Sequence, residues 1–292
     1  MTSDVQTHEP TAPTDDEIRH EQRAMWDTFS PGWEKWDDVV SATLGQVGDA
    51  LVRSINPRDD QQHLEVAAGT GEPGLTVAAL APRGRVTLTD LSPSMLAAAG
   101  RRATTKGLDN IELCECSADD LPYPDATFDS VSCRFGFMFF PDLRQAASEQ
   151  VRVLRPGGRI AAAVWAGPEA NLWATIPGDA IATEVELPAP SPGAPGMFRC
   201  ATPGMIASLL EGVGVRDIVE WEVPTVLTVD RPEDYWQLLT DCTAPVVAVL
   251  EQVDDGQRRR IASKVIDTAR GFESGGSVRL PGTARCIVGT RP

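Results

Sequence analysis

Short apolar runs alternate with glycine turns and helical segments through the middle of the chain. Runs typical of buried strands occur at 63–68, 85–90, 111–116, 128–135 and 159–165. Helical segments are predicted between them at 75–81, 94–107 and 143–154. Strands that alternate with helices in this way pair in parallel and are covered on both faces. The pattern therefore predicts an α/β fold around a doubly wound, mostly parallel sheet.

The segments on either side of this alternation are predicted to be mainly helical. Aromatic residues at three- and four-residue spacing predict two short helices near the N-terminus, interrupted at Ser30-Pro31-Gly32. After a proline-rich loop at 188–196, the pattern predicts further elements: a helix at 202–214, a strand at 215–223, two or three amphipathic helices within 231–273, and a last strand near 284–288. A helical segment inserted between late strands is typical of a cap over a site.

Composition narrows the class of protein and its partners. Hydrophobic residues make up 42% and charged residues 23%, as in soluble globular chains with a sizeable core. The formal net charge of −16 disfavours a polyphosphate partner, so we expect no nucleic-acid binding. No apolar stretch reaches the roughly 18 residues of a membrane span. The N-terminus lacks the basic start and apolar core of a signal peptide, and we expect a cytoplasmic protein that does not bind membranes.

Cysteine and histidine do not form a recognisable metal-binding pattern. The six cysteines include no C-x-x-C pair, and the three histidines, His8, His20 and His63, are far apart in the sequence. We therefore expect free thiols and no metal site. The sequence leaves open whether a magnesium ion helps to bind an anionic ligand.

A glycine turn follows the first predicted strand. Residues 69–74 read GTGEPG and open a helix, and Asp90 ends the next strand 21 residues after Gly69. Glycines let the backbone approach a ligand, and a carboxylate at this distance can accept both hydroxyls of a ribose. A nucleoside-containing cofactor is therefore predicted. Glu72 and Pro73 make the helix start less favourable for the pyrophosphate of NAD than for S-adenosylmethionine, without deciding between the two.

Four longer motifs occur in order at ordinary spacings. They are LEVAAGTGEPG, TLTDLSPSMLAAA, SADDLPYPDATFDSVSCRFGFMFFPD and VLRPGGRIAAAVW, within about residues 60–167. This series resembles the class I S-adenosylmethionine-dependent methyltransferases, and most of all the branch of ubiquinone/menaquinone-biosynthesis and natural-product methyltransferases. The resemblance implies a Rossmann-like, seven-stranded sheet, S-adenosylmethionine as cofactor and methyl transfer to a small molecule.

The resemblance also implies a domain organisation. Residues 1–15 would be a disordered tail, and 16–58, which contain AMWDTFSPGWEKWDD, an N-terminal helical lid. The S-adenosylmethionine-binding Rossmann-like domain would comprise 59–229 and 274–292, with a helical cap insertion at 230–273.

Cofactor-binding roles follow from the same resemblance. Glu65 would orient the methionine amino group, and Asp90 would hold the ribose diol. The other expected contacts, to the methionine, adenine or sulfonium parts, are Ala67, Gly69, Gly71, Leu91, Met95, Ser117, Ala118, Cys133, Arg134 and Trp33. Two positions depart from the family pattern: Ser117 stands where Asp is common, with Asp119 as a substitute, and Ala67 stands where many relatives have Gly.

Aromatic residues suggest an apolar acceptor. The expected acceptor-binding residues are Trp26, Phe29, Trp36, Phe137, Trp173, Phe198 and Trp236. They favour an aromatic, polyketide, quinone-like or isoprenoid small molecule, methylated at carbon or oxygen in bacterial secondary metabolism. If a base is needed, Glu169 is preferred, because loops at strand ends form the site in this architecture, and His20 is an alternative.

Other classes of function stay open at this stage. The glycine turn with Asp90 would also suit an NAD(P)-dependent oxidoreductase, and a methyltransferase-like fold could act as a cyclase without methyl transfer. The oligomeric state is also undecided, with a homodimer or a larger assembly among the alternatives.

Overall fold

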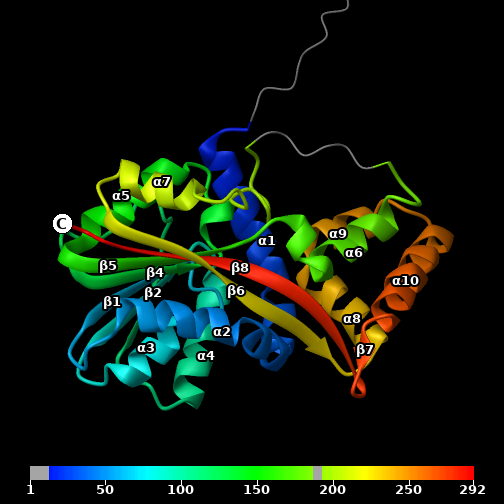
Figure 1. The fold of residues 1–292 in the computed structure, drawn as a ribbon, viewed down its shortest axis with the longest axis horizontal. Coiled ribbons are helices and arrows are strands. Elements are labelled where there is room, and N and C mark those ends of the chain that lie inside the picture. The colour runs from blue at the N-terminus through cyan, green and yellow to red at the C-terminus, as the bar shows by residue number, and fades with distance from the viewer. Residues whose placement is uncertain (1–12, 187–192) are drawn as a thin grey trace, which may run out of the picture.

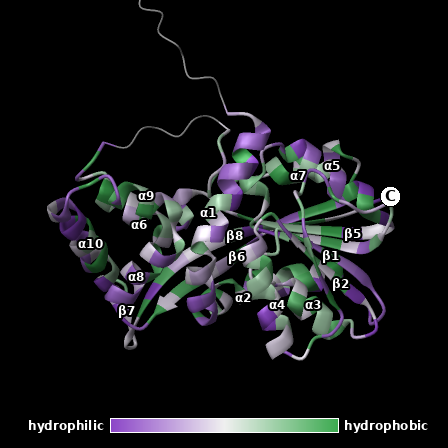
Figure 2. Ribbon diagram, turned by 180° about the vertical axis from the view of Figure 1, so that it is seen from behind, coloured by the Kyte–Doolittle hydropathy of each residue, from purple (hydrophilic) through white to green (hydrophobic). Residues whose placement is uncertain are grey.

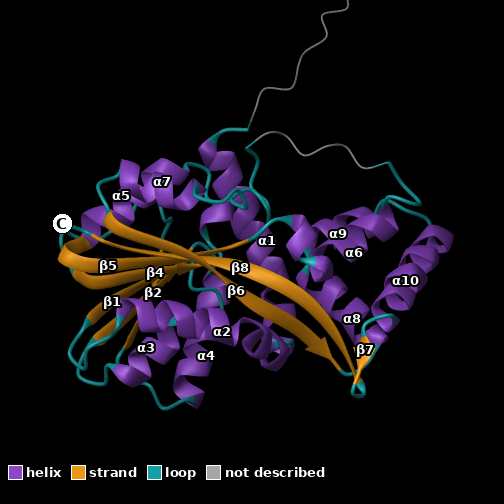
Figure 3. Ribbon diagram, viewed as in Figure 1, coloured by secondary structure: helices purple, strands orange, loops and turns teal. Residues whose placement is uncertain are grey.

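A computed structural model describes residues 13–186 and 193–292. Residues 1–12 of the predicted tail and 188–192 of the proline-rich loop lie outside the described residues. The described strands form one sheet in the order β3-β2-β1-β4-β5-β8-β6 (Figure 3). The strands are β1 (Gln62–Val66), β2 (Arg85–Asp90), β3 (Ile111–Glu115), β4 (Phe128–Arg134), β5 (Leu154–Trp165), β6 (Arg216–Val229), β7 (Glu273–Ser274) and β8 (Ser277–Thr290).

Strand direction agrees with the prediction. β1 to β5 pair in parallel, and β8 is antiparallel to both β5 and β6. The short β7 pairs only with β8 and lies off the seven-strand path. The predicted α/β fold with a mostly parallel, seven-stranded sheet is therefore confirmed. Parallel pairing brings the carboxyl ends of β1, β2 and β4 to one edge, which is where ligands bind in such sheets.

Helices cover both faces of the sheet (Figure 1). On one face lie α2 (Asp37–Ile55), α3 (Gly74–Leu80) and α4 (Pro93–Thr105), and on the other α5 (Leu143–Val153) and α7 (Met205–Gly212). The remaining helices are α1 (Asp15–Lys35), α6 (Leu172–Ile181), α8 (Pro232–Cys242), α9 (Ala244–Leu250) and α10 (Asp255–Arg270). Of these, α6 and α8 to α10 gather beside the far ends of β6 and β8.

Buried apolar side chains form two clusters. The main cluster lies between the sheet and its covering helices and includes Leu64, Val131 and Ile160, which are fully buried. The second cluster joins the helices near the ends of β6 and β8, with Tyr235 and Ile261 at its centre. Figure 2 shows apolar residues along the central strands and helices that carry both polar and apolar residues. The helices near the ends of β6 and β8 thus pack, with these strand ends, around an apolar cluster of their own.

Two details of the predicted elements are wrong. The N-terminal segment is not broken at Pro31, because α1 runs through it and ends at Lys35. A proline removes one helical N–H, and here the aromatic side chains on either side of it continue the same packed face. The fifth strand, predicted at 159–165, begins earlier, because β5 starts at Leu154 and includes Gly157, which adopts a left-handed φ of 78° beside an irregular pairing of β4 with β5.

The two helices in the segment predicted to be a lid pack differently. α1 packs against both α4 and α8, across the carboxyl edge of the sheet. By contrast, α2 buries Leu44, Val47 and Leu51 in the main cluster. Within the described residues, no helix is both long enough and apolar enough to cross a membrane.

Asn171 joins the end of β5 to β8, beneath the cap. Its amide Nδ2 donates to the carbonyls of Ala166, Gly167 and Thr283 at 3.1 Å each, and its Oδ1 accepts from the N–H of Thr283 at 3.0 Å. The side chain is fully buried. The same asparagine therefore satisfies four backbone groups that water cannot reach.

Asn171→Ala is expected to lower the free energy of unfolding by about 3 kcal/mol or more, because it leaves the Ala166 carbonyl and the Thr283 N–H without their partner, while the Gly167 and Thr283 carbonyls keep their bonds to the N–H groups of Ala170 and Ala166. Urea denaturation of this variant and of Gln252→Ala, whose exposed amide contacts only Ala248, measures the effect. A loss below about 1 kcal/mol in Asn171→Ala would contradict the assigned role.

Candidate functional site

The glycine turn between β1 and α3 adopts backbone conformations that few side chains tolerate. Gly69 and Gly71 have φ of 53° and 107°, and Ala67 lies at 54°. A Cβ on Gly74 would lie 2.4 Å from Leu88 Cδ2, so glycine there lets α3 pack directly against β2. The turn therefore places backbone, with little side-chain bulk, at the carboxyl edge of the sheet.

Asp90 ends β2 beside this turn. Its Oδ2 accepts from the Gly69 N–H at 2.8 Å, and its Oδ1 accepts from the Ser92 N–H at 2.9 Å. Burial raises the pKa of Asp90 to about 6, although N–H groups of Ser92, Gly69 and Leu91 act in the opposite direction. Asp90 is therefore mostly ionised at neutral pH, and its remaining lone pairs can accept hydroxyl donors.

A cavity of about 360 Å³ opens over the turn and Asp90. It extends from the carboxyl ends of β1, β2 and β4, beneath α1, to the connection between α8 and α9. Its polar end contains the glycine turn and Asp90. Its other end is lined by apolar and aromatic side chains from several elements: Trp26, Phe29, Met138, Phe139, Phe140, Trp165, Trp173, Met197, Leu227 and Leu238.

The aromatic side chains of this cavity contact one another. Phe135 stacks on Trp165 with ring centroids 4.3 Å apart, and Trp165 meets Trp173 edge-on at 5.0 Å. Trp26 of α1 packs edge-on against Phe139 at 5.2 Å. Such contacts hold flat apolar walls in fixed positions, which suits a ligand with a rigid or unsaturated skeleton.

Polar residues of α1 bind the rim of the sheet. Arg19 contacts Asp119 at 2.5 Å, and Asp27 accepts from the Ser92 hydroxyl at 2.6 Å. Further along, Glu34 forms a two-point contact with Arg101. These contacts fix α1 with its aromatic residues toward the cavity. Asp119 therefore lies against Arg19 and is not among the residues that line the cavity.

Many of the predicted ligand-binding residues meet at this cavity. Those that line it are Ala67, Gly69, Asp90, Leu91, Met95, Ser117, Ala118 and Arg134, together with Trp33, Trp26, Phe29 and Trp173. Glu65, Gly71 and Cys133 are buried behind the turn and do not line it. Burial raises the pKa of the Cys133 thiol well above its usual range, in keeping with a packing role.

Four of the predicted acceptor-binding residues lie elsewhere. Phe137 is fully buried and packs against Phe140 in the main cluster. Phe198 packs on the same cluster, and Trp236 packs on the second one. Trp36 ends α1 and donates its indole N–H to Asp241 Oδ2 at 2.8 Å. Each is an apolar side chain used for packing or for docking the cap, which its residue type alone does not reveal.

The two predicted bases are also outside the cavity lining. His20 lies on the exposed side of α1. Glu169 is exposed in the short turn at Pro168–Ala170, and its carboxylate folds back over Gly167. The loop does follow β5, as expected, but it points this side chain to solvent.

Glu169→Gln is therefore expected to change S-adenosylmethionine affinity and turnover by less than about twofold, since an exposed side chain away from the cavity makes no contact with a ligand there. Calorimetric titration and single-turnover measurements on this variant and the wild type decide the point. A drop of about 100-fold in turnover, of the size general-base catalysis supplies, would restore Glu169 as a base.

Several lining residues had not been assigned a site role from sequence. Trp165 lies at the carboxyl end of β5, and that position alone was a usable signal. Phe139 and Phe140 belong to the quoted FMFF run. Leu238 and Cys242 come from α8, and only the folded structure shows that the cap reaches this edge.

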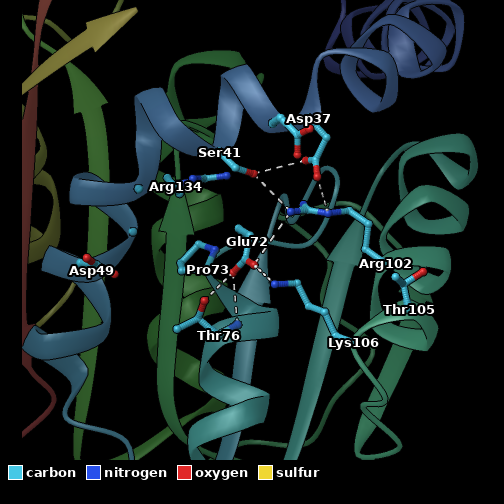
Figure 4. Close-up of a pocket in the computed structure, with 13 residues that line it drawn as sticks. Asp37, Ser41, Asp49, Glu72, Pro73, Thr76, Arg102, Thr105, Lys106 and Arg134 are labelled. Atoms are coloured by element: carbon cyan, nitrogen blue, oxygen red, sulfur yellow. Dashed lines mark hydrogen bonds and ion pairs between the residues drawn. The ribbon is translucent and has the colours of Figure 1, made fainter. Parts of the chain in front are cut away.

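A second, charged chamber of about 400 Å³ lies between α2, α3 and α4 (Figure 4). Arg102 pairs with Asp37 at 3.0 Å, and Lys106 pairs with Glu72 at 3.4 Å. Arg134 lines both this chamber and the cavity over Asp90. Burial lowers the pKa of Arg134, and the carboxylates of Glu65 and Glu72 oppose that effect.

Residues 64–162 match the model of the methyltransferase domain family. A ubiquinone/menaquinone biosynthesis C-methyltransferase from Brucella anthropi is 39% identical over 141 residues, which is 46% of this chain and 54% of that protein. The chain thus spans about half the length of the curated relatives it matches.

Solved structures extend the likeness in fold. The [4+2]-cyclase SpnF superposes with a TM-score of 0.60 at 19% identity, covering 96% of this chain and 98% of that one. A phosphoethanolamine N-methyltransferase from Haemonchus contortus, in complex with S-adenosylhomocysteine, gives 0.57 at 14% identity, with 97% and 61% covered. In sequence over its central domain and in fold over nearly its whole length, the chain resembles the class I S-adenosylmethionine-dependent methyltransferases, and in sequence the ubiquinone/menaquinone-biosynthesis branch.

Proposed function

We propose that this protein transfers the methyl group of S-adenosylmethionine to an apolar small molecule. The observation that carries the proposal is the two-ended cavity. At one end Asp90 is held beside the glycine turn, and at the other end aromatic side chains from the sheet, α1 and the cap converge. A nucleoside fits the first end and a flat hydrophobic skeleton fits the second.

The cofactor would lie across the carboxyl ends of β1, β2 and β4. In this placement Asp90 accepts the ribose hydroxyls, and Leu91 and Met95 pack on the adenine beside Ser117 and Ala118. The amino-acid end of the cofactor would reach toward Glu65 and the cationic Arg134. Support comes from the lining of the cavity and from the Haemonchus contortus neighbour, whose solved structure holds S-adenosylhomocysteine.

Methyl transfer from a sulfonium is an in-line displacement. The acceptor atom attacks the methyl carbon, and the bond to sulfur breaks as the new bond forms. Such a reaction depends on alignment and on exclusion of water, and positioning alone can supply roughly 7–11 kcal/mol. The aromatic walls and α1 provide both functions here, and the proposal requires no protein base.

The expected acceptor is a quinone-like, aromatic, polyketide or isoprenoid molecule. The apolar end of the cavity favours this class, and the name of the Brucella anthropi relative points toward ring carbon methylation of a quinone precursor. The same proposal also covers two more specific alternatives: methylation at oxygen instead of carbon, and a role in bacterial secondary metabolism instead of quinone biosynthesis. For the domains, we infer that α1 is the lid and that 230–273, together with α6, form the cap.

Mass spectrometry of reaction products tests the proposal. The protein is incubated with S-adenosylmethionine and a panel of reduced naphthoquinones, phenols and polyene macrolactones. A product heavier by one methyl group, absent without S-adenosylmethionine, is the expected result. An isomer of the same mass would instead indicate a cyclase, and oxidation of the substrate that depends on NAD would indicate an oxidoreductase.

A further inference from the structure

A row of buried polar side chains runs along one face of β1 and β4. The parallel pairing sets His63 beside Ser130 and Glu65 beside Ser132. Gln61 precedes the row at the start of β1, and all five side chains are at most 2% exposed. Polar groups buried this deeply require partners, and each of these contacts the next.

The hydrogen bonds in the row have a fixed direction. Gln61 Oε1 accepts from the Arg58 N–H at 3.0 Å, so the amide Nε2 faces Ser130 and donates to its hydroxyl. The Ser130 hydroxyl then donates to His63 Nδ1, 2.7 Å away, because its hydrogen would otherwise be buried without an acceptor.

The same direction continues beyond the imidazole. A neutral imidazole that accepts at Nδ1 carries its hydrogen on Nε2 and donates to Ser132 Oγ at 3.0 Å. Ser132 therefore donates its own hydrogen to Glu65 Oε2. Four donors in sequence end on one carboxylate oxygen, an arrangement in which each bond polarises the next.

The other oxygen of Glu65 has no partner. Oε1 is buried and accepts no hydrogen bond among the described residues. The charged groups on this face are Arg134 at the end of β4, Glu72 of the glycine turn, and Arg159 of β5, whose guanidinium donates to the Ser54 carbonyl. A buried carboxylate with one free oxygen is suited to a cationic N–H donor.

We propose that Ser130, His63 and Ser132 form a positioning relay that orients Glu65 behind the glycine turn, so that Oε1 attracts the ammonium group of the cofactor's methionine part toward this end of the cavity. The inference rests on the proposed function for the identity of this ligand. His63 and Ser132 act through Glu65, and neither needs to touch the cofactor.

The tautomer of His63 tests the relay without any ligand. Long-range 1H–15N spectra of the 15N-labelled, ligand-free protein separate the two neutral tautomers and the imidazolium. Only three histidines are present, and His63→Gln identifies the signal of His63. A neutral ring with its proton on Nε2 at pH 7 is expected. A proton on Nδ1, or an imidazolium, would overturn the relay.

Calorimetric titration of Ser132→Ala tests the effect on binding. Two ligands are compared: S-adenosylhomocysteine and 5′-deoxy-5′-(3-carboxypropylthio)adenosine, which lacks only the amino group. Affinity for S-adenosylhomocysteine is expected to fall about 10- to 100-fold, as on loss of a charge-assisted hydrogen bond. Affinity for the analogue should stay within about twofold, and Ser132→Thr, which keeps the hydroxyl, should restore most of the loss.

An equal loss for both ligands would assign Ser132 a merely structural role and overturn the proposal. Thr87→Val, a change at another buried hydroxyl on β2, controls for general damage to the sheet and should leave both affinities unchanged. If the wild type binds neither ligand, the proposed function fails, while the tautomer of His63 still decides whether the relay exists.

Discussion

Replacing Asp90 by alanine is expected to weaken binding of S-adenosylmethionine by about 100-fold or more. The carboxylate is held by the N–H groups of Gly69 and Ser92, so its free lone pairs point to the cavity. Hydrogen bonds to a charged group contribute about 1.5–3 kcal/mol each, and a ribose diol forms two. Asp109→Ala, an exposed carboxylate before β3, is the matched control and should bind as the wild type does.

The same residue predicts how binding depends on pH. Because the pKa of Asp90 is raised to about 6, the carboxylate is ionised above that pH and protonated below it. The ionised form is the better acceptor, so the dissociation constant should be flat near pH 7 and rise as pH falls. Below pH 6 the rise should approach about tenfold per pH unit. In Asp90→Ala the dependence should disappear, and an unchanged slope would assign it to another group.

Gly32→Ala is expected to displace α1 from the cap and to lower turnover about tenfold or more. A Cβ at this position would lie 1.9 Å from the Asp241 carbonyl oxygen, which is backbone and cannot rotate away. Three neighbouring contacts depend on the same close packing of α1 against the end of α8. Trp33 donates to the Cys242 carbonyl at 3.3 Å, and both Lys35 and Trp36 contact Asp241, at 2.6 and 2.8 Å.

Overpacking of this kind costs roughly 1–3 kcal/mol. That cost destabilises the arrangement in which α1 contacts the end of α8 and closes over the cavity. Tryptophan fluorescence and limited proteolysis report the position of α1, and product formation reports turnover. Gly178→Ala in α6 is the matched control, because its Cβ would meet nothing within 4 Å. Wild-type fluorescence and turnover in Gly32→Ala would show that the cavity does not depend on this contact.

The cofactor end of the site was largely predictable from the sequence. The glycine turn and Asp90 belong to consecutive strands, and parallel pairing of those strands brings their ends together regardless of the rest of the chain. Ser92 caps α4 by accepting from the Met95 N–H, a role that follows from its residue type and from the proline after it. Local rules and one topological rule were enough here.

For the acceptor end of the cavity, the sequence predicted an apolar, aromatic lining but not which residues form it. Its aromatic residues were expected, but which of them face the cavity depends on how α1 and α8 dock, and that docking is set by contacts between distant residues such as Trp36 and Asp241. Glu169 lies in an exposed turn away from the cavity lining, a placement the sequence does not reveal because loop direction follows no periodic pattern. The polar row was also hidden, since His63 meets Ser130 and Ser132 only through the register of β1 with β4.

Calorimetric titration of the wild-type protein with S-adenosylmethionine, S-adenosylhomocysteine and NAD tests the central claim most directly. Micromolar binding of the first two with no detectable binding of NAD is the result we expect, because the cavity offers a ribose acceptor and an apolar acceptor chamber. Binding of NAD alone would contradict the proposed methyltransferase function.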